Sequence, residues 1–316
     1  MNESAIRRVA VVATGVIGAS WATCFLARGL DVTAADPAPE AEAALRRTVA
    51  AQWPAMERMG LAPGASPDRL RFEASPEAAV AEAQFVQENG PERLDLKRDL
   101  FRRLDAAAPA EAVLASSSST LAMSDVQTAC DRHPERVVLG HPFNPPHLIP
   151  LVEVAGGRAT AEAAVERAMA FYRAIGKHPI RLRREVMGHV ANRLQAALWQ
   201  EAFNLVQAGV ASVADVDAAI AHGPGLRWAL LGPFLNLHLS GGAGGIGELF
   251  GKPLWQATEG MWRDLGSVSV DADLAERVVA GVREELAALD PEAMVRRRDE
   301  VLLALLRLRA ETGGLP

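Results

Sequence analysis

The sequence predicts an α/β fold, with a doubly wound parallel sheet in the N-terminal part of the chain and an all-α C-terminal part. Short β-branched runs alternate with helical patterns as far as about residue 184, and this alternation is typical of parallel sheets. Beyond that point, strand-like runs give way to long helical patterns. A length of 316 residues also exceeds what one hydrophobic core usually organises. We therefore expect two domains, residues 1–184 and residues 185–316.

The N-terminal elements follow one another in a β-α-β-α order. The run RVAVV predicts a strand at Arg8–Val12, and the apolar-periodic segment Ala19–Arg28 predicts the helix after it. A second strand, Leu30–Ala35, precedes an alanine-rich helix at Ala41–Met59. Further strands are expected at Phe85–Glu88, Val113–Ser116 and Val137–Gly140, separated by helical patterns such as Leu94–Ala106.

The C-terminal part is expected to be helical, with helices that include Val190–Ala208, Val213–His222 and Leu274–Leu289. The stretch GGAGGIG at 241–247 predicts either a flexible or binding loop or a simple connector between helices. Disorder is expected only at the chain ends, such as after Thr312. The apolar helices after residue 190 suggest a face buried against another copy of the chain, which predicts a homodimer.

Composition and charge narrow the possible partners. A formal net charge of -6 gives no electrostatic attraction to nucleic acid or to anionic membranes. Cys24 and Cys130 are far apart and stand beside apolar residues, as expected for buried, unbridged thiols in a reducing compartment. No leader and no run of about 18 apolar residues is evident. We expect a cytoplasmic protein that binds neither nucleic acid, nor membrane, nor metal.

The turn after the first strand carries a motif for binding a dinucleotide. The residues ATGVIG at 13–18 stand where the fingerprint G-x-G-x-x-G is expected. Gly15 allows the backbone to approach a pyrophosphate, Gly18 allows close packing of helix on strand, and the helix N-terminus, with Val16 and Ile17, offers free N–H groups. The first glycine of the motif is replaced by Ala13, whose methyl group lies where the turn is tightest.

Asp36 decides which dinucleotide the motif favours. It closes the second strand about 20 residues after the turn, where a carboxylate accepts hydrogen bonds from ribose hydroxyls and repels a 2′-phosphate. We therefore expect NAD rather than NADP as the cofactor. Asp36 is equally compatible with a role as a helix N-cap ahead of Pro37.

Polar side chains follow two later strands, at the sheet edge where α/β proteins bind ligands. The run SSSST at 116–120 follows one strand, and GHPFNP at 140–145 follows another. A serine run is often only a polar loop, and His141 before Pro142 could be a turn residue. Their joint occurrence favours a site that contains hydroxyl groups and an imidazole.

Taken in order, these motifs resemble the 3-hydroxyacyl-CoA dehydrogenase family over nearly the whole chain. The resemblance includes the dinucleotide turn, QENGPER at 87–93, the serine run, HPFNP at 141–145, LVEV at 151–154 and ANR at 191–193. The segment GLRWALLGPF at 225–234 is similar to the branch of the family that acts on free hydroxy acids. The resemblance implies an NAD-dependent oxidation of a C3 hydroxyl group.

The resemblance also implies roles for individual residues. His141 and Glu153 would form the catalytic pair, with Ser119 and Asn192 hydrogen-bonded to the substrate oxygen. Glu92, Lys97 and Ser117 would lie near the nicotinamide end of the cofactor. The candidates for substrate contact are Asn144 in the HPFNP motif, Arg227 as a clamp for a carboxylate, and Trp228 as part of an apolar or cation–π pocket with Trp199 and Phe234.

The proposed residue types suit the chemistry. Removing a hydride from C3 makes the hydroxyl group acidic, and imidazole is a base that titrates in the right range. A carboxylate on the other ring nitrogen fixes the tautomer and stabilises the imidazolium. Taken alone, Glu153 could be a strand-edge carboxylate, Asn192 a helix N-terminal residue, and the aromatic residues part of a core.

Several functions remain open at this level. The substrate could be carnitine-like or a sugar acid of the gulonate type, and a CoA thioester is a third option. A broad ketoreductase acting on 3-oxo esters is also possible. A protein of another class, a weakly catalytic NAD-binding structural protein, would be recognised by a broken His–Glu pair, whereas both members are present here.

Overall fold

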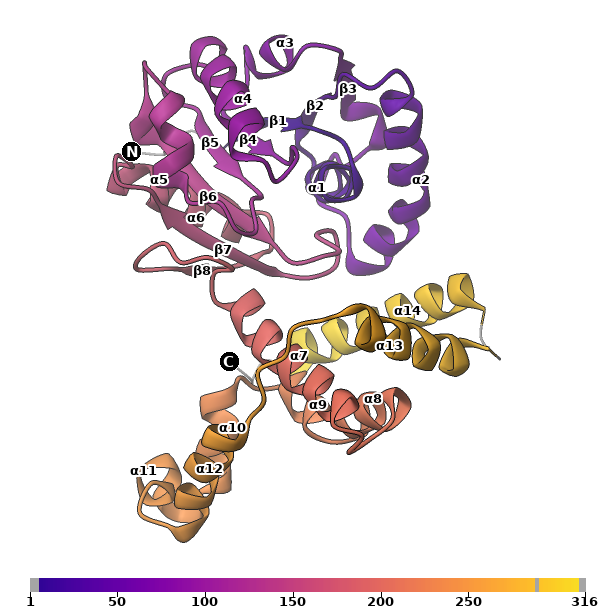
Figure 1. Ribbon diagram of the computed structural model, residues 1–316. Helices are drawn as coiled ribbons and strands as arrows, with labels where there is room; N and C mark the ends of the chain where they lie inside the picture. The colour runs from indigo at the N-terminus through magenta and orange to yellow at the C-terminus, as the bar shows by residue number, and fades with distance from the viewer. Residues whose placement is uncertain (1–5, 288–289, 313–316) are drawn as a thin grey trace. The chain divides into compact units, whose positions relative to one another are not determined.

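A computed structural model describes residues 6–287 and 290–312 of the chain. The chain divides into two compact units that join between Arg193 and Leu194. The first unit contains a sheet with helices, and the second is helical (Figure 1). The disorder expected after Thr312 and the last residues of the helix expected to end at Leu289 lie outside the described residues.

The first unit is built on an eight-stranded sheet with the order β3-β2-β1-β4-β5-β6-β7-β8. All neighbouring strands are parallel except β6 and β7, which are antiparallel. The predicted fold class is confirmed. The strands are β1 (Arg8–Val12), β2 (Asp31–Ala35), β3 (Leu70–Glu73), β4 (Phe85–Glu88), β5 (Val113–Ser116), β6 (Val137–Pro142), β7 (Leu151–Gly156) and β8 (His178–Arg181).

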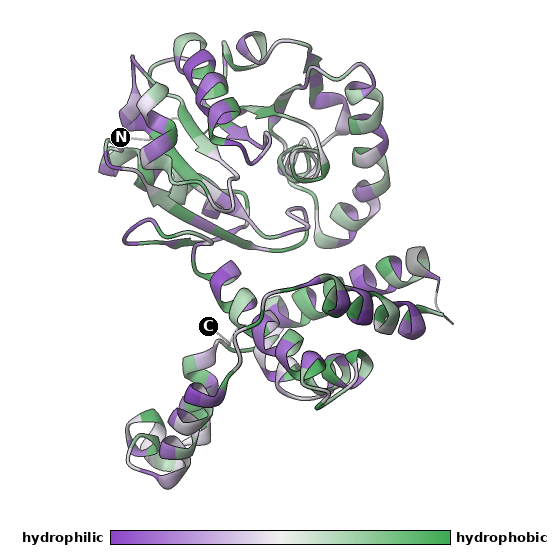
Figure 2. Cartoon of the chain, viewed as in Figure 1, coloured by the Kyte–Doolittle hydropathy of each residue, from purple (hydrophilic) through white to green (hydrophobic). Residues whose placement is uncertain are grey.

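Helices cover both faces of this sheet (Figure 1). Along β1, Val9 and Val11 belong to one hydrophobic core, while Ala10 and Val12 belong to another, because successive side chains point to opposite faces. Helices α1, α2 and α6 pack on the first core, and α3, α4 and α5 on the second. Their bounds are α1 (Val16–Ala27), α2 (Ala41–Met59), α3 (Pro76–Val80), α4 (Leu94–Ala107), α5 (Met123–Val126) and α6 (Glu162–Ala174). The strands between these layers are largely hydrophobic (Figure 2).

The structure adds elements that the sequence patterns did not predict. Strand β3 has the sequence LRFE, and two of its four residues are charged. Strand β7 contains Glu153 and runs antiparallel to β6. The first helix begins at Val16, three residues before the predicted start, because the glycine turn leads directly into it. This early start places the helix N-terminus at the turn itself.

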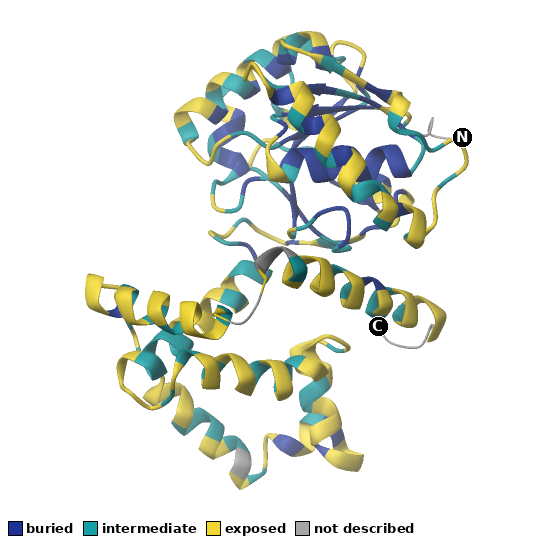
Figure 3. Ribbon diagram, turned by 90° about the vertical axis from the view of Figure 1, so that its right-hand side faces the viewer, coloured by how far each residue is buried: buried dark blue, intermediate teal, exposed yellow. Residues whose placement is uncertain are grey.

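The second unit consists of helices throughout the residues that the structure describes. The glycine-rich stretch 241–247, which was expected to be a flexible or binding loop or a simple connector, forms a 3₁₀ turn at Gly242–Gly244 and the start of α11, and so connects α10 with α11. The helices are α7 (Ala191–Gln207), which carries the chain from the first unit into the second, α8 (Val213–His222), α9 (Pro224–Trp228), α10 (Pro233–Ser240), α11 (Gly245–Leu249), α12 (Pro253–Asp264), α13 (Ala272–Leu286) and α14 (Pro291–Thr312). Most of their residues are exposed (Figure 3). None of the helices in the described ranges is long and apolar enough to cross a membrane.

Candidate active site

The polar motifs meet at the carboxyl edge of the sheet. Ala13 follows β1, Asp36 follows β2, Ser117 follows β5, and His141 lies near the end of β6. The strand order reverses between β1 and β4, because β1 has β2 on one side and β4 on the other. Ligands of open α/β sheets bind outside the carboxyl ends of the strands at such a reversal. The candidate site is therefore built from these loops.

The turn after β1 is as tight as the dinucleotide motif requires. Ala13 has φ 64°, in the left-handed region that favours glycine. Its N–H donates a hydrogen bond to the carbonyl oxygen of Ala35 at 2.8 Å, which ties the turn to β2. A Cβ atom on Gly18 would lie 2.0 Å from the carbonyl oxygen of Ala13. Glycine at position 18 is thus sterically required.

The N-terminus of α1 is open to a ligand. Gly15 is the N-cap residue, and no side chain caps the first turn of the helix. A Cβ atom on Gly15 would have no protein atom within 4 Å, and Val16 is 73% exposed. Unpaired N–H groups at a helix N-terminus attract phosphate oxygens. The residues present therefore fit the diphosphate of a dinucleotide.

Asp36 is held in place by Thr14, a residue that the sequence analysis did not single out. The Thr14 N–H donates to Asp36 Oδ2 at 2.8 Å, and the Thr14 hydroxyl group donates to the same atom at 3.3 Å. Asp36 Oδ1 accepts a hydrogen bond from the N–H of Ala38 at 2.9 Å. These contacts orient the half-buried carboxylate at the end of β2, where it can accept further hydrogen bonds from ribose hydroxyls.

His141 and Glu153 form a buried pair across two strands. The antiparallel register of β6 and β7 places the two residues directly opposite each other. His141 Nδ1 lies 2.8 Å from Glu153 Oε2, and His141 Nε2 lies 3.2 Å from the hydroxyl oxygen of Ser119. His141 is 4% exposed and Glu153 is fully buried. A carboxylate can only accept, so that Nδ1 carries a hydrogen and Nε2 can accept a proton.

The carboxylate of Glu153 also meets the start of α7. Its Oε1 accepts hydrogen bonds from the N–H groups of Val190 at 2.9 Å and Ala191 at 3.0 Å. Burial raises the pKa of Glu153, but the hydrogen bonds from His141, Ala191 and Val190 outweigh it and hold the pKa below its ordinary value. Glu153 is therefore ionised at neutral pH and can stabilise an imidazolium at His141.

The serine side chains of the run 116–120 bond different partners. The Ser117 hydroxyl donates to Asn89 Oδ1 at 2.7 Å, and the Ser118 hydroxyl donates to Glu92 Oε1 at 2.7 Å. Glu92 Oε1 also accepts from the N–H and hydroxyl groups of Thr120. Burial raises the pKa of Glu92, but the hydrogen bonds from Ser118 and Thr120 outweigh it and lower the pKa. Glu92 thus fixes the loop that presents Ser119 to His141.

Lys97 lies beneath the serine loop rather than at its surface. Its ammonium group is 2.8 Å from Glu88 Oε1 and 2.9 Å from Glu88 Oε2, with both side chains buried. The hydroxyl group of Ser116 donates to Glu88 Oε2 at 2.6 Å. Lys97 therefore supports the floor of the site through Glu88. The direct cofactor contact expected of Lys97 stays a prediction.

A second buried network holds Ser117, and the sequence analysis missed it. Burial raises the pKa of Tyr172 well above its ordinary value, and its hydroxyl group donates to Gln87 Oε1 at 2.6 Å. Gln87 Nε2 donates to the Ser117 hydroxyl at 2.8 Å and to the Gly140 carbonyl at 3.0 Å. A Cβ atom on Gly140 would lie 2.0 Å from the Tyr172 hydroxyl oxygen. This network fixes the residue before His141.

The remaining predicted residues belong to the loop after β6, to α7 and to α9. Asn144 is exposed in the loop after β6, and Asn192 is half-buried in the first turn of α7. Arg227 and Trp228 belong to α9 of the helical unit and are exposed. The substrate contacts expected of these residues stay predictions.

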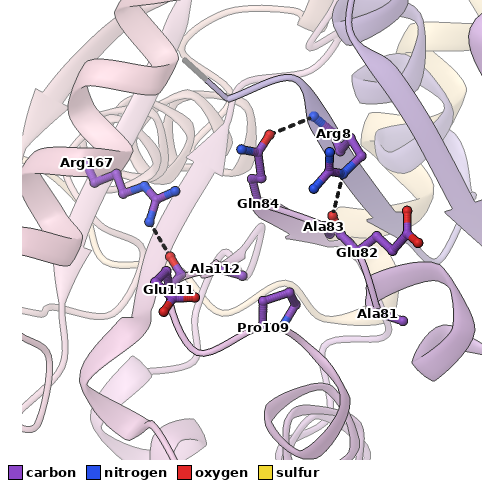
Figure 4. A pocket seen from close by; sticks show the side chains of 9 residues that line it. All are labelled: Arg8, Ala81, Glu82, Ala83, Gln84, Pro109, Glu111, Ala112 and Arg167. Atoms are coloured by element: carbon purple, nitrogen blue, oxygen red, sulfur yellow. Dashed lines mark hydrogen bonds between the residues drawn. The ribbon is translucent and has the colours of Figure 1, made fainter. Parts of the chain in front are cut away.

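A hollow of about 650 Å³ lies at the opposite, amino edge of the sheet (Figure 4). Its two arginines are engaged with the chain itself: Arg8 Nε donates to the Glu82 carbonyl at 2.9 Å, and Arg167 donates to the Glu111 carbonyl. Gln84 Oε1 accepts from the N–H group of Arg8 at 3.1 Å. This edge thus lacks the arrangement of base and hydroxyl groups found around His141. No cluster of metal-ligating side chains occurs among the residues that the structure describes.

Comparisons with known proteins identify the family of the chain. Residues 8–186 match the NAD binding domain of 3-hydroxyacyl-CoA dehydrogenase, and residues 188–265 match its C-terminal domain. The chain is 54% identical to an L-carnitine dehydrogenase of Streptomyces griseus subsp. griseus over 98% of this chain and 91% of that one. It is 47% identical to an L-carnitine dehydrogenase of Pseudomonas aeruginosa, over 97% of this chain and 95% of that one.

Solved structures resemble the chain over similar lengths. A 5-formyl-3-hydroxy-2-methylpyridine 4-carboxylic acid 5-dehydrogenase, described as an NAD+ dependent dismutase, is 29% identical with a TM-score of 0.82, over 96% of this chain and 98% of that one. A diketoreductase is 30% identical with a TM-score of 0.64, over 72% of this chain and 83% of that one.

Fold, site and comparisons together define an NAD-dependent oxidoreductase that acts on a CH–OH group at C3 of its substrate. The chain belongs to the 3-hydroxyacyl-CoA dehydrogenase family.

Proposed function

We propose that this enzyme oxidises the 3-hydroxyl group of L-carnitine with NAD, using His141 as the general base. The observation that carries the reaction is the Glu153–His141–Ser119 chain of hydrogen bonds at the carboxyl edge of the sheet. The substrate is supported by the two L-carnitine dehydrogenases, which the chain matches at 54% and 47% identity over nearly its full length. The intact His–Glu pair argues against a weakly catalytic structural protein.

The protein's own residues account for the proton transfer. His141 Nε2 accepts the proton of the substrate hydroxyl, while Nδ1–H remains bonded to the Glu153 carboxylate. Glu153 stabilises the imidazolium, as a buried carboxylate does in other oriented bases. The Ser119 hydroxyl group would hold the substrate oxygen near Nε2, so that the C–H bond is aligned. When bound, NAD supplies the acceptor for the hydride from C3.

The cofactor contacts follow the geometry of the turn. We propose that the N–H groups at the start of α1, from Val16 and Ile17, bind the diphosphate, with Gly15 leaving room for its approach. Asp36 would accept hydrogen bonds from the ribose hydroxyls, and Ser117 and Glu92 would lie near the nicotinamide.

Recognition of L-carnitine needs groups for a carboxylate and for a quaternary ammonium. We propose Arg227 for the carboxylate and Trp228 for the cation, because guanidinium pairs with carboxylates and indole faces attract cations. Both side chains are exposed on α9. Asn144 and Asn192 would contribute hydrogen bonds to the substrate oxygens.

A screen for NAD reduction tests the substrate directly. L-carnitine, L-gulonate, 3-hydroxybutyrate and a 3-hydroxyacyl-CoA are compared at matched concentrations, with NADH formation followed by absorbance. We expect saturable turnover of L-carnitine well above that of the others. A higher kcat/KM for L-gulonate or for the CoA thioester would show that this compound, and not L-carnitine, is the substrate. Equal rates on many 3-oxo esters in the reverse direction would indicate a broad ketoreductase.

The base assignment predicts the effect of removing the imidazole. His141→Ala should lower kcat by about 100-fold or more, the usual contribution of a general base, while NADH affinity by fluorescence titration stays near that of the wild type. His133→Ala is the matched control, because the half-exposed ring of His133 pairs with Glu135, outside the candidate site. Wild-type turnover in the His141 variant would show that His141 is not the general base.

We also propose a homodimer in a reducing, cytoplasmic compartment. The helical unit exposes large apolar side chains, among them Leu194, Trp199 and Phe234 at 59%, 53% and 74%. Large apolar side chains that are left exposed in this way favour an interaction surface. Cys24 and Cys130 are free and buried, and burial raises the pKa of Cys130 to about 12, so that neither thiol has the exposure that disulfide chemistry requires.

A further inference from the structure

A second histidine lies against the catalytic pair. His189 is 4% exposed, and its ring centroid is 4.9 Å from that of His141, with the two planes tilted by 55°. Its backbone has φ 53°, directly after Gly188 at φ 74°. A residue other than glycine rarely adopts this left-handed conformation, because its Cβ atom is crowded there. Such a conformation persists only where the surrounding structure imposes it, and it is most common at functional sites.

The ring of His189 makes one defined hydrogen bond. Its Nε2 lies 2.9 Å from the carbonyl oxygen of Ser118. A carbonyl oxygen can only accept, so that Nε2 carries the hydrogen. Nδ1 is buried and has no hydrogen-bond partner among the described residues. The neutral ring therefore has a fixed tautomer, with the donor directed at the peptide that precedes Ser119.

The same turn contacts both partners of His141. On one side, the N–H groups of Val190 and Ala191 bond Glu153, which holds His141 Nδ1. On the other side, His189 bonds the carbonyl group between Ser118 and Ser119, and the Ser119 hydroxyl lies 3.2 Å from His141 Nε2. Three consecutive residues, 189–191, thus connect the carboxylate side and the hydroxyl side of the imidazole.

We propose that His189 is a positioning residue for the oxidation: by holding the Ser118 carbonyl group, it fixes the Ser119 hydroxyl against His141 Nε2. The proposal rests on the proposed function, because it takes His141 as the base. It does not require His189 to touch substrate or cofactor. The alternative is that the ring of His189 only fills space next to His141.

Two substitutions separate these roles. His189→Phe keeps an aromatic ring and removes the donor, whereas His189→Gln removes the ring and places an amide N–H near the position of Nε2. We expect kcat/KM to fall about 10-fold in the Phe variant, the effect of one lost positioning hydrogen bond, and to stay within about 3-fold of wild type in the Gln variant. His133→Phe is the control, because His133 precedes β6 at the opposite edge of the sheet. NADH affinity should be the same in all variants.

A double-mutant cycle with Ser119→Ala tests whether His189 acts through Ser119. Residues that act as one unit show non-additive effects. We expect His189→Phe to lower kcat/KM by no more than about 2-fold in the Ser119→Ala background. Full multiplication of the two effects, or a Gln variant as impaired as the Phe variant, would show that the ring serves packing and would overturn the proposal.

A measurement on the resting protein keeps this test separate from the choice of substrate. Histidine side-chain ¹⁵N NMR, assigned with the His189→Gln variant, should show a neutral His189 with the hydrogen on Nε2. A hydrogen on Nδ1 would overturn the hydrogen bond whatever the substrate is. If the wild type oxidises another 3-hydroxy acid but not L-carnitine, the proposed substrate fails, and the cycle is measured with the acid that is oxidised.

Discussion

At the scale of single residues, the dinucleotide turn contains a local conflict between residue type and backbone. Ala13 occupies the left-handed region at φ 64°, where its Cβ is unfavourable. The turn nonetheless keeps the close approach at Gly18 and the hydrogen bond from Ala13 to Ala35. The surrounding contacts therefore impose the conformation on the alanine.

Ala13→Gly is expected to relieve this conflict. We predict an unfolding free energy that is unchanged or higher by up to about 1 kcal/mol, and NADH binding that is as tight as in the wild type or tighter. Urea unfolding and fluorescence titration measure the two effects. As a control, Ala19→Gly inside α1 should destabilise the protein by about 1 kcal/mol. Weaker NADH binding in the Ala13 variant would show that the methyl group contributes to the cofactor site.

The burial of His189 predicts a pH-dependent stability. Burial lowers the pKa of His189, and the nearby His141 lowers it further, while the Ser118 carbonyl, Glu153 and Glu92 act in the opposite direction. The neutral form is thus favoured in the fold. In the unfolded chain histidine titrates near pH 6.5, so the unfolded state takes up the proton first as the pH falls.

The contribution of His189 to stability is therefore complete above about pH 6.5 and declines as the pH falls from there toward the lower pKa of the folded state. We predict that the wild type loses more unfolding free energy than His189→Gln between pH 7.5 and pH 5.5. Urea titrations at several pH values measure the difference. Parallel curves for the two proteins would contradict a lowered pKa.

The sequence predicted the candidate site residues that follow strands. It did not predict the buried residues that support them from distant positions in the sequence. Asp36 and His141 stand directly at strand ends, so the α/β topology itself places them at one edge. Tyr172 reaches Gln87 over 85 positions of sequence, and His189 reaches Ser118 over 71. Hydrogen bonds between such distant residues leave no local pattern, because only the folded chain brings the partners together.

At the scale of elements, the site depends on two strands that differ from the rest of the sheet. Strand β7 carries a charged residue, Glu153, in its interior, and it runs antiparallel to β6. A charged residue inside a buried strand is atypical of a parallel sheet, since it needs a partner. That partner is His141, so the charge that makes the strand hard to recognise in the sequence is the charge that pairs with the proposed base.

The buried Lys97–Glu88 pair connects α4 with β4 beneath the serine loop. Removing one partner alone should therefore lower the unfolding free energy strongly. Lys97→Met leaves the Glu88 carboxylate buried without its countercharge, which typically costs 3–5 kcal/mol, so we predict a loss of about that size in the unfolding free energy. The double variant Lys97→Met, Glu88→Gln should recover much of it, because no uncompensated charge remains. A single variant as stable as the wild type would show that water reaches Glu88.

At the scale of the whole molecule, the two units differ in how completely they bury their own apolar side chains. The sheet unit has two extensive cores on its two faces, whereas α7 and α8 contain no buried residue. Helices of 17 and 10 residues have little stability without packing partners. The proposed homodimer would supply packing partners for these two helices.

The proposed homodimer predicts a measurable link between assembly and stability. Sedimentation equilibrium or light scattering should give about twice the chain mass of 33.6 kDa. Because a dimer dissociates on unfolding, the midpoint of thermal unfolding should rise with protein concentration. Phe234→Glu, which places a charge on a side chain that is 74% exposed in the single chain, should shift the population toward monomer, whereas Val16→Glu at the cofactor turn, 73% exposed, should not. A monomer at all concentrations, with a constant midpoint, would mean that the apolar faces of the helices are covered within one chain.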